Sequence, residues 1–415
     1  MPKALVISNL HAPDCFGGYE MVASECMDIL EREHGWQIRC HCANSGRERA
    51  PAYPPRVVAD LSGYFPRGWT HHHTLLPVGR HLVKNTAKIV ETLQREASEA
   101  DVTLLFNPRR LSTLQWIPAL KASKNVVAWV SDYWPSEYPD CDKLWQAANT
   151  EKFSYSPAVM LGAARVRRAY EGGRPAADDL KHIRKAAFVS EFVLKKNAPF
   201  FPNLEEAVVL PNGIERALFP FAATAPIRQN TWGFCGRIQH DKGLALALDI
   251  FEEAAKEKQD LNFLIAGDMG TGYGREMRRK IEESPILRRH VTVLGKIPRE
   301  ELAAKFYHRV GVLLFTSLWE EPFALTVLEA MSCGTLVVAT NTGGTGEIVT
   351  KARGILFDIP KENKKTGEIQ KKIIEKINNF LPENLQTISE NVNSNYTINK
   401  MAQKLAKTAL HARIS

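Results

Sequence analysis

The stretch VGVLLFTSLWEEPFALTVLEAMSCGTLVVAT, residues 310–340, predicts a strand, a helix and a second strand in that order. VGVLLFTS and TLVVAT are short apolar runs with the length of buried strands. Between them, FALTVLEAMSC has the apolar spacing of a helix and ends at Gly334, a residue type that commonly terminates helices. Buried strands joined by helices are typical of a parallel sheet, so this stretch predicts an α/β fold with a doubly wound sheet.

The same alternation of strands and helices extends toward both ends of the chain. It stops at a turn rich in proline, asparagine and glycine, residues 211–213, and then starts again. The sequence therefore predicts two Rossmann-like, doubly wound parallel-sheet domains that face a central cleft, where a ligand binds. Further strands are expected at KALVISNL (3–10), DVTLLF (101–106), NVVAWV (125–130), AAFVS (186–190), AVVLPN (207–212), TWGFCG (231–236), LNFLIAGD (261–268) and VTVLG (291–295).

The domain limits follow from the turn and from a change in composition near the end of the chain. We expect a first domain over residues 1–210 and a second domain over residues 211–390. From residue 361 onward the sequence becomes rich in lysine, asparagine and isoleucine, but the apolar residues keep helical spacing. The last helix, within residues 391–415, is expected to pack back on the first domain.

Composition excludes several classes of protein. With 415 residues, 44% of them hydrophobic and 24% charged, the chain has the balance of an ordinary globular protein of two or three domains. No apolar run approaches the roughly 18 residues that a transmembrane helix needs. The N-terminal residues lack the pattern of a signal peptide, and we expect a cytoplasmic location.

A net charge of +8 permits anionic partners but does not choose among them. The sequence has no zinc-finger spacing, no aromatic–basic RNA-binding signature and no basic region before heptads, so we expect no nucleic-acid partner. Positive charge is densest over residues 165–196, where acidic residues interrupt it. A solvated helix face is our interpretation of this stretch, and it leaves open a peripheral contact at the inner face of a membrane.

Metal ligands and disulfides are not expected. The seven cysteines are an odd number without a secretion signal, which favours free thiols. Cys40, His41 and Cys42 are too closely spaced for a zinc knuckle and lack a second pair, so they are interpreted as the end of a strand. His71, His72 and His73 are consecutive and cannot easily converge on one ion.

Ligands of an open parallel sheet gather at the carboxyl ends of its strands, and two such loops have suitable residues. Gly17 and Gly18 follow the first strand and precede a helix, which allows a close backbone approach to phosphate or sugar. Arg237 and Lys242 follow the strand TWGFCG, and Gly243 opens a helix after them. Two cations at a helix N-terminus suit a diphosphate, whereas a solvated pair would not explain their place after a strand.

Two glutamates occupy the loop and the helix that follow VGVLLFTS. If the segment were helical throughout, the eight residues from Glu321 to Glu329 would span about 12 Å, too far for a glycosidase pair. That span is close to the separation of sugar and ribose in a nucleotide-sugar. The glycine-rich turn MGTGYG (269–274) does not match the dinucleotide fingerprint, so NAD is not inferred.

Seven motifs together resemble family 4 of the retaining glycosyltransferases, which have the two-domain GT-B fold. The resemblance covers residues 3 to about 357 and is most specific in the second half of the chain. The motifs are GGYE (17–20), LPNGIE (210–215), GFCGRIQHDKG (233–243), FLIAGD (263–268), LGKIP (294–298), SLWEEPFALTVLEAMSCGTLVVAT (317–340) and TGGTGEIV (342–349).

The resemblance implies a role for each matching position. Arg237 and Lys242 would bind the donor diphosphate and stabilise the leaving group without a metal ion. Glu329 would accept hydrogen bonds from the ribose, and Glu321 would face the transferred sugar. The remaining donor contacts would come from the backbone or the loops: Gly17 and Gly18 at the diphosphate, Lys296 and Ile297 at the base, and Phe323, Ala324, Leu325 and Thr326 at sugar hydroxyls and phosphate.

The sequence departs from the family pattern at two places. Many relatives have glycine at the position of Ala324, and the family often has a His-Asp pair where this chain has Ser131 and Asp132. A histidine role is therefore not transferred, and Asp132 is a candidate for contact with sugar or acceptor.

The resemblance implies a hexosyltransferase that moves a sugar from a nucleoside diphosphate sugar to an acceptor hydroxyl with retention of configuration. A UDP-sugar or a GDP-sugar is the donor we expect first. The first domain would bind the acceptor, which would be a sugar, a glycan, a lipid or another small molecule. The second domain would bind the donor. Two alternatives stay open. One is a module that binds nucleotide-sugar without transferring it, with Ser131 and Ala324 as signs of decay, and the other is a nucleotide-sugar epimerase on the same architecture.

Overall fold

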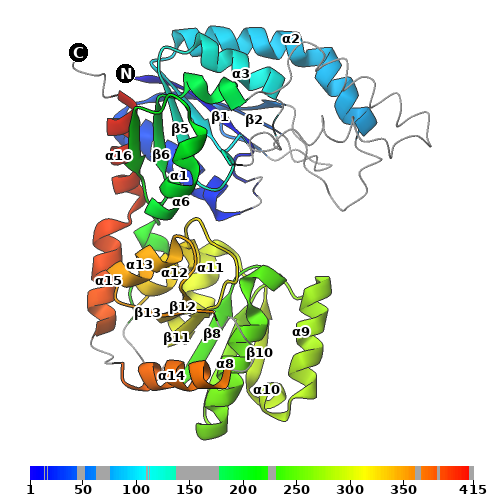
Figure 1. Ribbon diagram of the computed structural model, residues 1–415, viewed down its shortest axis with the longest axis vertical. Helices are drawn as coiled ribbons and strands as arrows, with labels where there is room; N and C mark the ends of the chain where they lie inside the picture. The colour runs from blue at the N-terminus through cyan, green and yellow to red at the C-terminus, as the bar shows by residue number, and fades with distance from the viewer. Residues whose placement is uncertain are drawn as a thin grey trace. The chain divides into compact units, whose positions relative to one another are not determined.

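The computed structural model describes two compact units. The described residues are 1–13, 15, 17–43, 52–61, 75–108, 111, 113–136, 177–222, 230–359, 366–380 and 384–410. One unit consists of Met1–Pro211 together with Ile398–Ser415, and the other of Asn212–Thr397. Figure 1 shows that each unit has its own sheet with helices packed on it.

The first unit contains a seven-stranded parallel sheet in the order β3-β2-β1-β4-β5-β6-β7. The chain runs outward from β1 to β3, returns to β4 on the other side of β1, and continues outward to β7. The strands are β1 (Lys3–Ser8), β2 (Gln37–Ala43), β3 (Val57–Leu61), β4 (Val102–Phe106), β5 (Val126–Val130), β6 (Lys185–Phe188) and β7 (Glu206–Val209), and the helices are α1 (Gly18–His34), α2 (Leu75–Glu99), α3 (Thr113–Ala122), α6 (Glu191–Asn197), α16 (Ile398–Leu410) and the 3₁₀ turns η4 (Ala177–His182) and η5 (Ala198–Phe200).

The second unit contains a six-stranded parallel sheet in the order β10-β9-β8-β11-β12-β13. Its chain also reverses direction at the centre, between β8 and β11. The strands are β8 (Thr231–Cys235), β9 (Asn262–Ala266), β10 (Val291–Gly295), β11 (Val312–Phe315), β12 (Leu336–Thr340) and β13 (Ile355–Phe357), and the helices are α8 (Leu244–Glu257), α9 (Gly272–Glu283), α10 (Pro285–His290), α11 (Arg299–Lys305), α12 (Leu325–Ser332), α13 (Thr345–Lys351), α14 (Thr366–Asn378), α15 (Asn384–Asn395) and the 3₁₀ turns η6 (Arg216–Leu218), η7 (His240–Lys242) and η8 (Tyr307–Arg309).

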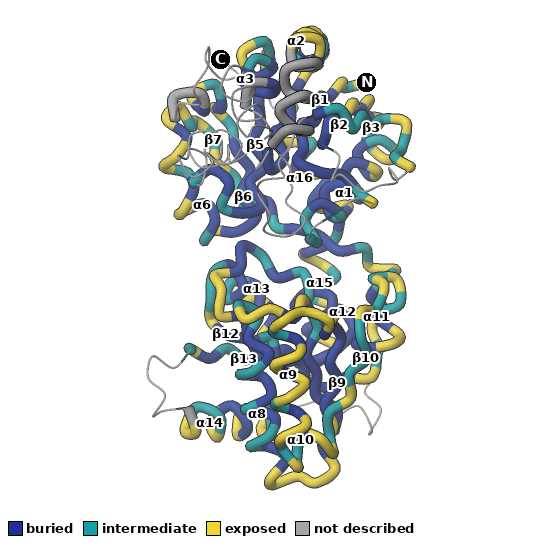
Figure 2. Tube along the Cα trace, turned by 90° about the vertical axis from the view of Figure 1, so that its right-hand side faces the viewer, coloured by how far each residue is buried: buried dark blue, intermediate teal, exposed yellow. Residues whose placement is uncertain are grey.

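Central strands are buried along their whole length, because helices cover both faces of the sheets. Every residue of β4, β5 and β12 is buried, and these strands consist almost entirely of aliphatic and aromatic residues. In Figure 2 the buried colour follows the strands, whereas exposed residues concentrate on outer helices such as α9 and α10. Continuous apolar runs, rather than alternating ones, are what a parallel sheet covered on both faces requires. The predicted α/β architecture is therefore confirmed.

The helices at the end of the chain divide between the two units. Helix α15 packs against α12 in the second unit, whereas α16 packs against α1 in the first unit. Asn399 Nδ2 donates a hydrogen bond to Glu33 Oε2 over 2.7 Å, and Asn125 Nδ2 donates to the backbone carbonyl of Ala409, also over 2.7 Å. The change of unit lies between Thr397 and Ile398, within the segment 391–415 that was expected to contain the last helix.

The structure describes residues 177–196 of the basic stretch 165–196, which was interpreted as a solvated helix face. Residues 165–176 lie outside the described residues, as do His71, His72, His73 and Cys141. Farther along, Arg184 and Lys185 form ion pairs with Glu205 and Glu206 over 3.2 and 3.4 Å. Within the described segments, no helix is long and apolar enough to cross a membrane.

His41 is a buried cation held by two carboxylates. The Cys40-His41-Cys42 run lies on β2, and the side chain of His41 is only 1% exposed. Its Nδ1 lies 2.9 Å from Asp60 Oδ1 and its Nε2 lies 2.8 Å from Glu96 Oε2. Burial lowers the pKa of His41, but the hydrogen bonds to both carboxylates outweigh that effect and raise it to about 9. Across the described segments, no group of three or more His, Cys, Asp or Glu side chains is arranged to hold a metal ion.

The raised pKa of His41 predicts that the first unit loses stability in mild alkali. A histidine whose folded pKa exceeds its unfolded value of 6.5 stabilises the fold fully below pH 6.5, and this contribution disappears as the pH rises through about 9. A shift of that size corresponds to roughly 3 kcal/mol of unfolding free energy. Urea unfolding at pH 6 to 10 should show this loss in the wild type and in the control His34→Gln. His41→Gln should lack it, and an alkaline loss that persists in His41→Gln would contradict this assignment.

Candidate functional site

The two central strands of the second unit define where a ligand can bind. After β8 the chain leaves toward β9, and after β11 it leaves toward β12 on the opposite side. The connections that follow adjacent strands at such a reversal diverge and leave space at the carboxyl edge of the sheet. Residues 236–243 follow β8 and residues 316–324 follow β11, so both loops predicted to bind the donor lie at this edge.

Gly243 brings the two loops into direct backbone contact. It has a φ of +71°, and a Cβ at this position would lie 1.9 Å from the carbonyl oxygen of Thr316. The Thr316 hydroxyl donates a hydrogen bond to the Gly243 carbonyl over 2.8 Å, and the Leu318 amide donates to the Asp241 carbonyl over 2.8 Å. Only glycine allows both this backbone conformation and this approach. The loop that carries Lys242 is therefore held against the loop that carries Glu321.

Lys242 and Glu321, which are 79 positions apart, form an ion pair. Lys242 Nζ lies 2.6 Å from Glu321 Oε1, and the hydroxyl of Ser317 donates to the same oxygen over 2.8 Å. The Lys242 ammonium also lies 4.8 Å from the centre of the Trp319 ring. Both charged side chains keep about an eighth of their surface exposed, 13% for Lys242 and 12% for Glu321. The pair is thus fixed in position yet open to a ligand.

Arg237 and the start of α8 add positive character near Lys242. Arg237 is exposed in the loop directly after β8. Helix α8 begins at Leu244, immediately after the Gly243 cap, and has 14 residues. Its first backbone amides point out of the helix and carry partial positive charge. One sequence segment thus supplies two cations and a helix N-terminus, a combination suited to a phosphate-bearing ligand.

Glu329 lies on α12 with two partners that the sequence motifs do not contain. Arg299 Nε lies 3.2 Å from Glu329 Oε1, and the Tyr307 hydroxyl donates to Glu329 Oε2 over 2.9 Å. Helix α12 begins only at Leu325, so Glu321 precedes it and the helical estimate of about 12 Å between the two carboxylates rested on a wrong assumption. Arg299 could have been suspected, because it follows directly after the LGKIP loop at a strand end.

The segment 323–326 leads into the N-terminus of α12. Ala324 is its N-cap residue, with φ −96° and ψ 92°, a conformation open to any L-residue. Phe323, Leu325 and Thr326 are partly exposed, whereas Ala324 is 4% exposed. They lie at the start of α12, where the first backbone amides of a helix are available to a ligand. Ile297 packs against the core of the second unit, and Lys296 beside it is exposed.

The remaining predicted residues belong to the first unit. Gly17 is the N-cap residue of α1, and its amide donates to Glu20 Oε2 over 2.9 Å. Asp132 follows β5 and is 6% exposed. Its carboxylate accepts hydrogen bonds from Asn107 Nδ2 over 3.1 Å and from the Trp134 amide over 3.0 Å. Gly17, Gly18 and Asp132 thus follow the strands β1 and β5 at the carboxyl edge of the first sheet, where ligands of such sheets bind.

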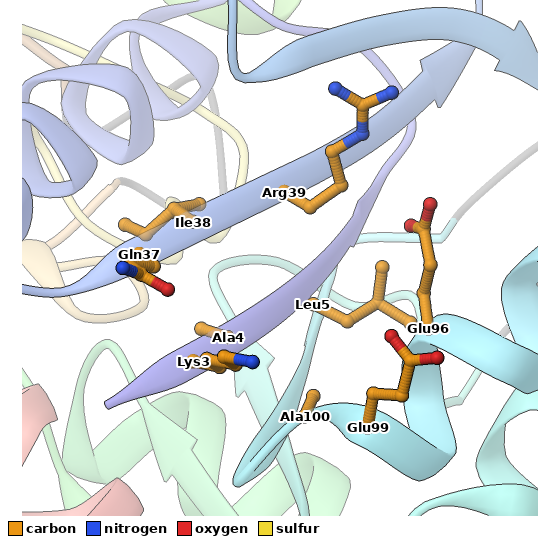
Figure 3. A pocket seen from close by; sticks show the side chains of 9 residues that line it. All are labelled: Lys3, Ala4, Leu5, Gln37, Ile38, Arg39, Glu96, Glu99 and Ala100. Carbon is orange, nitrogen blue, oxygen red and sulfur yellow. The ribbon is translucent and has the colours of Figure 1, made fainter. Parts of the chain in front are cut away.

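A separate pocket of about 200 Å³ lies at the opposite edge of the first sheet. Figure 3 shows that its lining comes from the starts of β1 and β2 and from the end of α2. It combines the cationic side chains of Lys3 and Arg39 with the carboxylates of Glu96 and Glu99. Because ligands of open parallel sheets bind at the carboxyl edge, we do not assign this pocket to the functional site.

Comparison with solved structures identifies the fold. The chain superposes on sucrose-phosphate synthase from Thermosynechococcus elongatus with a TM-score of 0.63 at 16% identity, over 98% of each chain. It superposes on Anabaena HepE in complex with UDP and glucose with a TM-score of 0.62 at 18% identity, over 98% of this chain and 99% of that one. Two parallel sheets in this order make the chain an α/β protein with the GT-B glycosyltransferase fold.

One family model matches within the second unit. Residues 216–394 match the family described as Glycosyl transferases group 1. Glycogen synthase from Mycobacterium tuberculosis is 32% identical over 166 residues, which cover 39% of this chain and 38% of that protein. The D-inositol 3-phosphate glycosyltransferase from Corynebacterium jeikeium is 34% identical over 138 residues, which cover 32% of this chain and 32% of that protein. The matches thus span less than half the length of these relatives.

Proposed function

We propose that the protein is a retaining glycosyltransferase that moves a sugar from a nucleoside diphosphate sugar to an acceptor hydroxyl without a metal ion. The observation that carries the proposal is the Lys242–Glu321 pair at the carboxyl edge of the second sheet, with Lys242 in the same loop as Arg237 and just before the N-terminus of α8. It combines a site for a diphosphate with a carboxylate for sugar hydroxyls. The family of the second unit and the glycosyltransferase relatives support the same reaction class.

The chemistry follows from the charges in this site. A lysine ammonium has three N–H donors. Glu321 Oε1 lies 2.6 Å and Asp241 Oδ2 lies 3.5 Å from Lys242 Nζ, so at least one N–H can bind a phosphate oxygen while the ion pair with Glu321 persists. As the bond to the sugar breaks, negative charge builds up on the departing diphosphate. Lys242, Arg237 and the α8 dipole stabilise that charge, which is the role a metal ion would otherwise fill. The acceptor hydroxyl attacks the sugar carbon from the side of the leaving group and its proton passes to an oxygen of the departing diphosphate, so the configuration is retained.

UDP is the first nucleotide to test, because the structurally similar HepE was solved with UDP and with UDP-glucose. GDP is the second nucleotide to test, in line with the sequence-based expectation. We propose that the acceptor is a hydroxyl-bearing sugar, glycan, lipid or small molecule, bound by the first unit near Asp132. A peripheral contact of the basic stretch with the inner face of a membrane is part of the same proposal, and sedimentation with anionic vesicles tests it.

Nucleoside diphosphates should raise the melting temperature of the wild type. A ligand at a hundred times its dissociation constant adds about 2.7 kcal/mol to the free energy of unfolding. We expect one of UDP, GDP, ADP or dTDP, measured in EDTA, to produce such a shift, and Lys242→Ala to weaken it. If no nucleotide shifts the melting temperature, the proposed function is wrong.

Product analysis separates the proposal from its alternatives. A binding module would show the thermal shift without releasing nucleoside diphosphate from any donor. An epimerase would convert one nucleotide-sugar into another and form no new glycoside. A transferase releases nucleoside diphosphate and forms a new glycoside in equal amounts, once donor hydrolysis has been subtracted.

A further inference from the structure

The carboxylate of Glu329 is held from two sides. Arg299 Nε lies 3.2 Å from one oxygen, and the Tyr307 hydroxyl donates to the other over 2.9 Å. Glu329 is 6% exposed, and the side chain of Arg299 is 10% exposed. A carboxylate bound in this way has a single orientation. It also has part of its charge balanced inside the protein, which offsets the cost of burying it.

Both partners are themselves fixed. The guanidinium of Arg299 lies 5.3 Å from the centre of the fully buried Phe219 ring, and Arg299 is the first residue of α11. Tyr307 has no exposed surface, and burial raises its pKa well above the ordinary value. The phenol therefore stays protonated and acts as a hydrogen-bond donor. Neither Arg299 nor Tyr307 belongs to the motifs on which the family resemblance rests.

The arrangement leaves acceptor capacity on both oxygens of Glu329. A carboxylate oxygen offers about two lone-pair positions, and the contacts with Arg299 and Tyr307 use one on each oxygen. Two acceptors on one rigid carboxylate match two donors on neighbouring carbon atoms, as in the 2′- and 3′-hydroxyls of a ribose. Arg299 also follows Lys296 and Ile297 by only two or three residues, so the loop expected at the base leads into the residue that orients Glu329.

We propose that Arg299 and Tyr307 are positioning residues that orient Glu329 toward both hydroxyls of a ribose, so that the site selects ribonucleoside over deoxyribonucleoside diphosphates. The inference rests on the proposed function, because it assumes that a nucleoside diphosphate binds here. It narrows the donor class, since a thymidine diphosphate sugar with its deoxyribose would be disfavoured.

Calorimetric binding of paired nucleotides tests the proposal. UDP, GDP and ADP are each compared with their 2′-deoxy counterparts, for the wild type and for Arg299→Gln, Tyr307→Phe and Arg309→Gln. For the best-bound base, the wild type should prefer the ribonucleotide by at least about tenfold, the effect of one hydrogen bond to a charged group. Arg299→Gln and Tyr307→Phe should reduce this ratio to below about threefold. Arg309 is an exposed residue of the neighbouring η8 turn, and its replacement should leave the ratio unchanged.

The ratio of the affinities for the ribonucleotide and its 2′-deoxy counterpart distinguishes a positioning role of Arg299 and Tyr307 from a purely structural one. A structural defect would weaken both nucleotides equally and keep the wild-type ratio, and a variant with that behaviour would remove its residue from the proposal. Tyr307→Phe deletes a single hydroxyl, so it decides the outcome if Arg299→Gln fails to fold. Equal binding of ribo- and deoxyribonucleotides by the wild type would overturn the inference while leaving the proposed function intact. Failure of every nucleotide to bind would overturn both.

Discussion

Replacing Lys242 by alanine is expected to lower the turnover of donor by roughly 100- to 1,000-fold, the usual cost of removing one group that stabilises charge in a transition state. Lys242 lies within 2.6 Å of Glu321 and beside the N-terminus of α8, where a departing diphosphate would need positive charge. The effect should appear mainly in kcat, because the charge on the leaving group grows as the bond breaks. Initial rates of nucleoside diphosphate release from UDP- and GDP-sugars measure it.

Stability must be recorded for the same variant, because the deletion leaves Glu321 with less compensation. Glu321 keeps its hydrogen bond from Ser317 and is partly exposed, so we expect the free energy of unfolding to fall by only about 1–2 kcal/mol. Lys256→Ala is the matched control, since Lys256 is an exposed lysine of α8 that pairs with Glu253. Wild-type turnover in a folded Lys242→Ala protein would remove Lys242 from the mechanism.

Replacing Gly243 by alanine is expected to destabilise the second unit strongly. The new Cβ would lie 1.9 Å from the Thr316 carbonyl oxygen, and the residue would also have to keep a φ of +71°. The clash is with backbone, so it can be relieved only by separating the loops after β8 and β11. We expect a loss of at least about 3 kcal/mol in the free energy of unfolding, measured by urea denaturation.

Gly295→Ala separates the two causes of that loss. Gly295 lies in the same unit with a φ of +77°, but a Cβ there would have no neighbour within 4 Å. Its replacement should cost only the conformational penalty, about 1–2 kcal/mol. Equal destabilisation by the two changes would show that the close contact at Thr316 is unimportant. A Gly243→Ala protein that folds should also bind nucleoside diphosphate poorly, because Lys242 would lose its place beside Glu321.

The sequence was most informative where the strands are buried on both faces. VVAWV and LVVAT are continuous apolar runs with no polar interruption, and both form fully buried strands. The strands β2, β3 and β13 were not predicted as complete strands. Only the end of β2 was predicted, at Cys40, His41 and Cys42, because Arg39 and His41 interrupt the apolar pattern of QIRCHCA. The carboxylates of Asp60 and Glu96 that balance the buried histidine are known only from the structure. β13 has only three residues, too few for a periodicity to show.

The candidate site was predictable to the extent that it follows strand ends. Arg237, Lys242 and Glu321 were singled out because parallel strands place their carboxyl ends at one edge, and the structure brings Lys242 and Glu321 within 2.6 Å of each other. Ser317 and Trp319 lie in the same loop but were not singled out, because a serine and a tryptophan have no charge to attract notice. Their contacts with Glu321 and Lys242 appear only in three dimensions.

By itself, the sequence determined the α/β class, the two-sheet architecture and the loops that carry the candidate donor site. These properties depend on local periodicity and on the order of elements, which neighbouring residues encode. Only the tertiary structure decided that Lys242 pairs with Glu321, that Gly243 must be glycine, and that Arg299 and Tyr307 orient Glu329. Each of these contacts joins residues separated by 22 to 79 positions. Such pairings arise from strand order and helix packing, and no local pattern in the chain specifies them.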